Sequence, residues 1–129
     1  MEWKHVKPLG ESGIAEVETL IGKSLPADYK ELVQNYNGGR PTADNFLVGN
    51  SERQFKTLQS LNRDDIETVF KSWELDSQLQ GKILPIASDP GGNLLCYNLE
   101  NFEIVFWWHE DDEIVKVADN LTEFLSMLH

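Results

Sequence analysis

The second half of the chain carries four apolar runs with very short connections between them, and this pattern limits the fold more than any other feature. The runs are of strand length: Ile83–Ala87, Leu94–Leu99, Glu103–Trp108 and Ile114–Val117. The segments between them read DPGGN, ENF and HEDDE. Because strands joined by short connections are usually antiparallel neighbours, the sequence predicts a β-meander.

The run that contains FWWH is apolar on both of its faces. Ile104, Phe106 and Trp108 alternate with Val105 and Trp107, and His109 follows. A strand that is apolar on both faces is typical of a sheet interior covered on both sides. We therefore expect a central strand with helices over one face and a loop, or a partly exposed aromatic patch, over the other. Pro85 lacks an N–H for the ladder, so its strand is predicted to be an edge strand or to begin there.

Four segments show the apolar spacing of helices. The first ends at Gly22, and the second begins near Pro26 and ends at Asn37-Gly38-Gly39. The third is expected to be capped by Asn62, with Asp64 and Asp65 in its first turn, and the fourth by Asn120. Their apolar stripes are Ile14, Val17, Leu20 and Ile21; Tyr29, Leu32, Val33 and Tyr36; Ile66, Val69, Phe70 and Trp73; and Leu121, Phe124, Leu125 and Leu128.

Two short strands, Phe46–Val48 and Gln54–Leu58, are predicted between the second and third helices. The resulting order of helix, helix, strands, helix, meander and helix is typical of the α+β class. We therefore predict an antiparallel β-sheet with four helices packed against it. The 129 residues suit a single domain, residues 1–129.

Acidic residues outnumber basic ones by two to one, 22 against 11, which gives a net charge of −11 at pH 7. A field of this sign repels nucleic acid and attracts basic proteins, although the acidity could also serve solubility alone. Cys96 has no partner for an internal disulfide, which fits a reducing compartment. The chain has no apolar run of the ~18 residues that a membrane helix needs, nor a leader-like start. We expect a cytoplasmic protein with no membrane contact.

The sequence resembles the SUKH superfamily, which includes regulators of the yeast Knr type, in four blocks. LPADYKELVQNYNGGRP provides an apolar-Pro pair, a Tyr-bearing helix and an Asn-Gly-Gly stop. ILPIASDPGGNLLCYNL matches a strand that enters an Asp-Gly-Gly turn before an apolar strand with Cys. FWWHE and the final helix complete the pattern, which runs from about Ile14 to Leu128.

The resemblance implies a SUKH-like α+β domain with no shared catalytic residues. It also implies the role of many bacterial members, which is immunity to a secreted or contact-dependent toxin, often a nuclease. Other members are cytoplasmic regulatory or scaffold modules, which is the alternative function. An enzyme or a small-ligand binder is a third class.

The densest cluster of functional residue types is His109-Glu110-Asp111-Asp112-Glu113. It lacks the second His of a zinc-protease motif and the spacing of an EF-hand, so we predict no metal site. It is either a solvated hairpin tip or an acidic loop that meets a basic toxin domain. For the second case the predicted partner-binding residues are Asp89, Trp108, Glu110, Asp111, Asp112 and Glu113.

The DPGGN segment could be a phosphate-binding loop, but the residues that follow it read as a strand rather than a helix. Pro90 and the two glycines instead suit a hairpin turn, which leaves Asp89 as a partner contact. No nucleophile stands beside His109, and Cys96 lies within a strand where a thiol is usually core. We predict no enzyme activity and no cofactor. At least one of Trp107 and Trp108 is expected in the core, the other being a candidate interface anchor, and the protein is expected to be a monomer or a weak homodimer.

Overall fold

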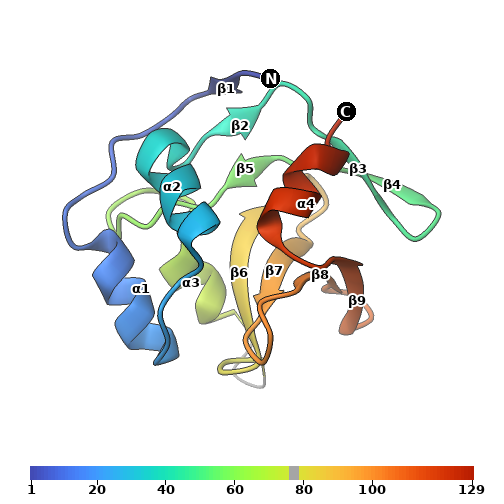
Figure 1. Ribbon diagram of the computed structural model, residues 1–129. Helices are drawn as coiled ribbons and strands as arrows, with labels where there is room; N and C mark the ends of the chain where they lie inside the picture. The colour runs from blue at the N-terminus through green and yellow to red at the C-terminus, as the bar shows by residue number, and fades with distance from the viewer. Residues whose placement is uncertain (76–78) are drawn as a thin grey trace.

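The computed structural model describes residues 1–75 and 79–129. Both ends of the chain lie at the same end of the molecule (Figure 1). The elements in chain order are β1 (Trp3–Lys4), α1 (Gly13–Ile21), α2 (Ala27–Tyr36), β2 (Arg40–Pro41), β3 (Asn45–Val48), β4 (Ser51–Gln54), β5 (Thr57–Leu58), α3 (Val69–Trp73), β6 (Ile83–Ser88), β7 (Leu94–Asn98), β8 (Ile104–Trp108), β9 (Glu113–Ala118) and α4 (Leu121–Met127).

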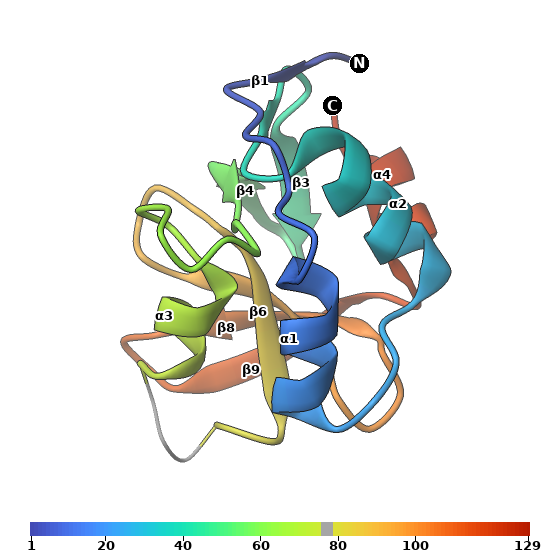
Figure 2. The same cartoon turned by 90° about the vertical axis from the view of Figure 1, so that its left-hand side faces the viewer.

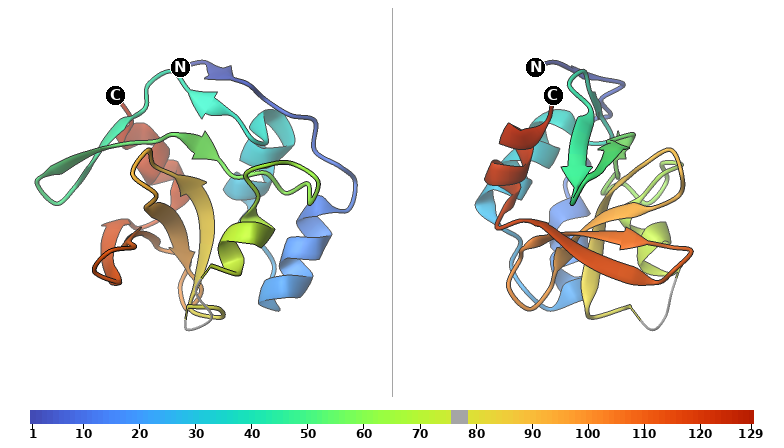
Figure 3. Two further views of the ribbon diagram at one scale, coloured as in Figure 1. Left: turned by 180° about the vertical axis from the view of Figure 1, so that it is seen from behind. Right: turned by 90° about the vertical axis from the view of Figure 1, so that its right-hand side faces the viewer.

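The main sheet is antiparallel, with the strand order β5-β6-β7-β8-β9. This confirms the α+β class and the predicted meander, to which the short strand β5 adds one member. The sheet lies behind α2 and α4 in Figure 1, and the β8–β9 hairpin crosses the front of the right-hand view in Figure 3. Two smaller antiparallel pairs, β1–β2 and β3–β4, stand outside it.

Strand β8 lies inside the sheet, between β7 and β9, and side chains on both of its faces are buried. Phe106 is fully buried in the larger core, together with side chains from α1, α2, α3 and α4. The opposite face carries a smaller core of Ile83, Leu94, Cys96, Val105 and Trp107, against which Leu79 packs. Leu79, which lies between α3 and β6, agrees with the loop alternative for this second face.

Three helices lie where the sequence places them, and a local signal sets at least one boundary of each. Gly22 closes α1 with a left-handed φ of 71°, and Gly38 follows α2 with a φ of 72°. Pro26 precedes the first residue of α2, where its missing N–H leaves no bond unmade. The Asn120 side chain accepts a hydrogen bond of 2.8 Å from the Glu123 backbone N–H and so caps α4.

The start predicted for the third helix is wrong. The helix α3 begins at Val69, and its cap is Thr68, whose hydroxyl accepts from the Lys71 N–H. Asn62 instead bonds the Gly10 N–H and the Pro8 carbonyl, which ties the N-terminal segment to this loop. Ile66, which the helical spacing had placed on the buried stripe, is 84% exposed.

The single strand predicted over Gln54–Leu58 is also wrong, because the chain changes sheets there. The Phe55 N–H donates to the Asp44 carbonyl, while the Lys56 N–H donates to the Ser88 carbonyl at 2.8 Å. Strand β4 therefore ends at Gln54, and β5 begins at Thr57.

Pro85 lies within β6, which is neither an edge strand nor begins at Pro85. It pairs with Cys96 beside a register shift between Pro85 and Ala87. On its other side β6 pairs with β5 only at Ala87 and Ser88, so no strand needs an N–H from Pro85.

Candidate interaction surface at the β8–β9 hairpin

The turn between β8 and β9 places four carboxylates at one tip of the molecule. Glu110, Asp111 and Asp112 form the turn, Glu113 opens β9, and all four are exposed. None of the salt bridges between described residues involves any of these four side chains. The tip is therefore a compact site of unneutralised negative charge.

One of the four carboxylates also stabilises the turn. The indole N–H of Trp107 donates to Oδ1 of Asp112 at 2.8 Å, and Asp112 has a positive φ of 54°. Aspartate tolerates this conformation better than most residues, which suits it to the position. A substitution at Asp112 would therefore change the shape of the hairpin as well as its charge.

Trp108 is half-buried at the base of the tip. Its ring meets Phe106 edge-on at 4.9 Å, and the guanidinium carbon of Arg53 lies 4.7 Å from its ring centroid. Glu113 lies directly across from Trp108 in the ladder. The guanidinium of Arg53 therefore shields part of the indole from solvent. Trp107 is the tryptophan that is buried, at 7% exposure.

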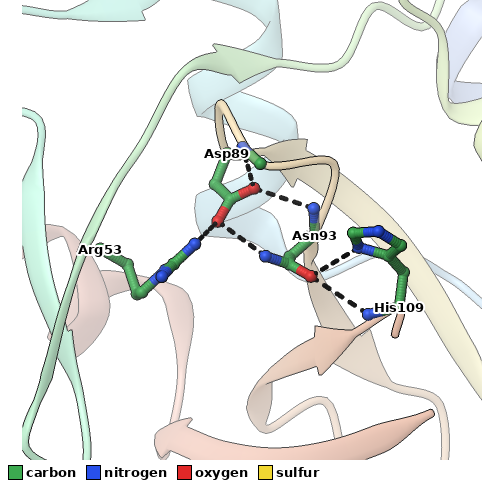
Figure 4. Close-up of polar contacts among 5 residues, drawn as sticks. Arg53, Asp89, Asn93 and His109 are labelled. Carbon is green, nitrogen blue, oxygen red and sulfur yellow. Dashed lines mark hydrogen bonds and ion pairs between the residues drawn. The ribbon is translucent and has the colours of Figure 1, made fainter. Parts of the chain in front are cut away.

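Asp89 lies in the β6–β7 turn and is 3% exposed, so it offers almost no surface to a partner. Its Oδ1 accepts from the N–H groups of Gly91 and Asn93, at 2.9 and 2.8 Å. Its Oδ2 accepts from Arg53 at 2.6 Å and from the Asn93 amide at 3.1 Å (Figure 4). The carboxylate holds the turn together and anchors Arg53 of β4.

Asn93 links this turn to the acidic hairpin. Its Oδ1 accepts from the His109 backbone N–H at 3.1 Å and lies 2.8 Å from His109 Nδ1 (Figure 4). Gly92 lies beside the His109 ring, and its φ of 86° is a backbone conformation that suits glycine. Arg53, Asp89, Asn93 and His109 thus form one network that joins β4 to the β6–β7 and β8–β9 turns.

Burial alone would raise the pKa of the Asp89 carboxyl. The hydrogen bonds from Arg53 and Asn93, together with the charge of Arg53, outweigh burial and hold that pKa below its usual range. Asp89 is therefore ionised at neutral pH, and its charge is balanced by Arg53.

The described residues show little that could drive catalysis at this site. Burial raises the pKa of the Cys96 thiol, which lies inside the smaller core. The His109 ring contacts an amide rather than a carboxylate. No group of three or more His, Cys, Asp or Glu side chains is placed to hold a metal ion, within residues 1–75 and 79–129. Across the same described ranges, no helix has the length and apolarity needed to cross a bilayer.

The sequence identified the acidic tip but missed what supports it. Arg53 comes from a hairpin far away in the chain, and no local pattern marks it as a partner of Asp89 or Trp108. Asn93 looks like an ordinary turn residue in the sequence. Its one local signal is its place after the Gly-Gly pair, where a side-chain amide can reach back to the turn.

The comparison with protein families agrees with this architecture. The family described as SMI1-KNR4 cell-wall (SUKH_6) matches residues 11–125. The chain therefore belongs to the SUKH superfamily, and the resemblance carried by the four sequence blocks is confirmed. The SPbeta prophage-derived uncharacterized protein YokK of Bacillus subtilis (strain 168) is 26% identical over 138 residues, which cover 89% of this chain and 72% of that protein.

Proposed function

We propose that this protein is a non-catalytic immunity protein that neutralises a cognate bacterial toxin by binding and occluding it. SUKH membership supports this class of protein. The prophage origin of the related protein YokK is compatible with a gene carried beside its toxin. The net charge of −11 favours a basic partner, such as a nuclease with a cationic substrate groove.

The binding surface in this proposal is the tip of the β8–β9 hairpin. The observation that carries it is the set of four exposed carboxylates without an ion-pair partner in the described part of the chain. Lys and Arg side chains of a toxin groove would bind Glu110, Asp111 and Glu113 as they bind phosphates. Trp108 lies beside them and adds an aromatic contact. Asp89 is left out of this surface because its carboxylate is buried and bonded within its own turn.

A regulatory module that binds a cellular protein is the second candidate, since the superfamily also includes regulators. The acidic hairpin serves either role, and the two differ in the partner rather than in the surface. In both cases the protein acts as a single domain, works without a cofactor and is located in the cytoplasm.

Co-expression tests the immunity role. The gene next to this one is expressed from an inducible promoter in a bacterial host, with and without this protein. We expect the neighbouring product to stop growth alone, and this protein to restore growth and to co-purify with that product. If the neighbouring product is harmless, or if growth is not restored, immunity is contradicted and the regulatory role is favoured.

A charge-reversal pair tests the surface. Glu110→Lys with Asp111→Lys should abolish rescue, whereas Glu31→Lys with Glu100→Lys should not. The second pair changes the net charge equally at exposed positions on α2 and after β7. Asp112 is not used because its bond to Trp107 supports the fold.

A further inference from the structure

Basic side chains gather around Ile66 in this otherwise acidic protein. Ile66 and Glu67 line both of two hollows, of about 320 and 210 Å³. The larger lies between α3 and the β6–β7 turn, and the smaller lies between the N-terminal segment and β5. We call the residues lining the two hollows the Ile66 surface. α3 and the segment that precedes it are seen in Figure 2.

The charge of this surface is opposite to that of the whole chain. Its basic residues are Lys7, Arg40, Lys56 and Lys71, and its acidic residues are Glu67 and Asp89. Both acidic side chains already form salt bridges. Lys56 Nζ lies 2.9 Å from Glu67 Oε1, and a terminal guanidinium nitrogen of Arg53 lies 2.6 Å from Asp89 Oδ2. The surface therefore has an excess of positive charge.

Two of these cations are free to meet an external anion. Lys7 and Arg40 line the smaller hollow, and neither forms a salt bridge with any residue that the structure describes. The Arg40 Nε donates to the Lys56 carbonyl at 2.8 Å, which fixes the guanidinium and leaves its terminal nitrogens for another acceptor.

The same surface exposes two large aliphatic side chains. Ile66 is 84% exposed, and Leu75, on the rim of the larger hollow, is 65% exposed. Exposed aliphatic side chains beside a hollow with a charged rim are typical of protein docking sites.

We propose that the Ile66 surface docks an acidic segment of a partner protein. An apolar side chain of that segment packs between Ile66 and Leu75, and its carboxylates meet Lys7 and Arg40. This inference goes beyond the immunity role and does not depend on it. The acidic hairpin would bind a basic partner, whereas the Ile66 surface would bind an acidic one.

Peptide binding followed by NMR tests this surface directly. The probe is a capped peptide of alternating glutamate and leucine, titrated into the isotope-labelled full chain, with a capped lysine–leucine peptide of equal length for comparison. A protein of charge −11 repels the acidic peptide in general, so its binding reports a local surface. We expect shifts at the Ile66 and Lys71 backbone amides.

Substitutions at exposed positions complete the test. Ile66→Ser and Lys7→Glu should each lower the affinity for the acidic peptide by about tenfold, as loss of a central contact usually does. Leu47→Ser and Lys82→Glu change exposed residues outside both hollows and should leave its affinity unchanged. The inference is overturned if the acidic peptide does not bind at millimolar concentration, if it shifts other residues, or if the two control variants weaken it equally.

Discussion

Asp89 receives more hydrogen bonds from other residues than any other carboxylate described, and it fixes two turns at once. It bonds Gly91, Asn93 and Arg53 directly, and Asn93 passes the constraint on to His109. The sequence predicted the turn but treated this carboxylate as a surface group. Its burial makes it a stabilising residue, because a buried charge is retained when hydrogen bonds and a counter-ion compensate its desolvation.

Replacing Asp89 should lower stability in a pH-dependent manner. Asp89→Ala is expected to reduce the free energy of unfolding by about 3 kcal/mol at pH 7, since it leaves several buried donors unpaired. The pKa of Asp89 is lower in the folded state than in the unfolded chain, so its contribution is complete above the unfolded pKa and is lost as the pH falls through the folded pKa.

Urea denaturation of the wild type and Asp89→Asn checks this, from pH 7 down to pH 3. The difference in unfolding free energy between the two should be constant at neutral pH and should shrink below about pH 4. A difference that does not change with pH would contradict the assigned charge state.

Cys96 should be inert in the native protein. Its side chain is fully buried and burial raises its pKa, so the reactive thiolate is scarce and inaccessible. We expect no reaction with Ellman's reagent at pH 8 in native buffer, and one thiol per chain after unfolding in urea. Rapid reaction in native buffer would show that the smaller core opens.

At the scale of elements, local signals predicted most of the fold. Gly22, Pro26 and Asn120 gave three helix boundaries correctly because each acts through its own backbone or its nearest turn. The meander followed from short connections, which leave few alternative pairings. The failures have a different cause, since they depend on contacts between distant segments.

The loop before α3 shows this most clearly. Asn62 has the side chain of a helix cap, but it bonds the Gly10 N–H and the Pro8 carbonyl instead. Ile66 falls on an apolar spacing by coincidence, as its exposure shows. In the same way, the acidic tip was visible in the sequence, whereas Arg53 beneath it was not.

The aliphatic residue Ile66 and the aromatic residue Phe70 should respond differently to replacement by alanine. Ile66→Ala should change the free energy of unfolding by less than about 0.5 kcal/mol, because the side chain is in solvent. Phe70→Ala, at a position 7% exposed, should cost about 3 kcal/mol or more. Denaturant midpoints measure both losses of unfolding free energy. Equal losses would indicate that Ile66 is buried, as the helix predicted from the sequence requires.

At the scale of the whole molecule, charge is distributed unevenly. The whole chain has a net charge of −11. The β8–β9 tip carries carboxylates without ion-pair partners among the described residues, whereas the Ile66 surface has more basic than acidic side chains. The network through Asn93 connects the β6–β7 turn, which borders the larger hollow, to the acidic hairpin. This network therefore links the border of the Ile66 surface to the base of the acidic hairpin.

Association with a basic toxin should depend strongly on salt. Raising the salt from 0.05 M to 0.5 M should slow association by about tenfold or more, with a smaller change in the dissociation rate, because screening weakens long-range attraction. Surface plasmon resonance at several salt concentrations measures both rates. An association rate that does not change with salt would place the contact away from the acidic tip.

The affinity of the purified toxin for the charge-reversed hairpin tests the central claim most directly. Isothermal titration calorimetry would compare the wild type, Glu110→Lys with Asp111→Lys, and the control pair Glu31→Lys with Glu100→Lys. We predict a loss of about a hundredfold or more for the hairpin pair and little change for the control pair. Equal affinities for the hairpin pair and the wild type would contradict occlusion by the β8–β9 tip.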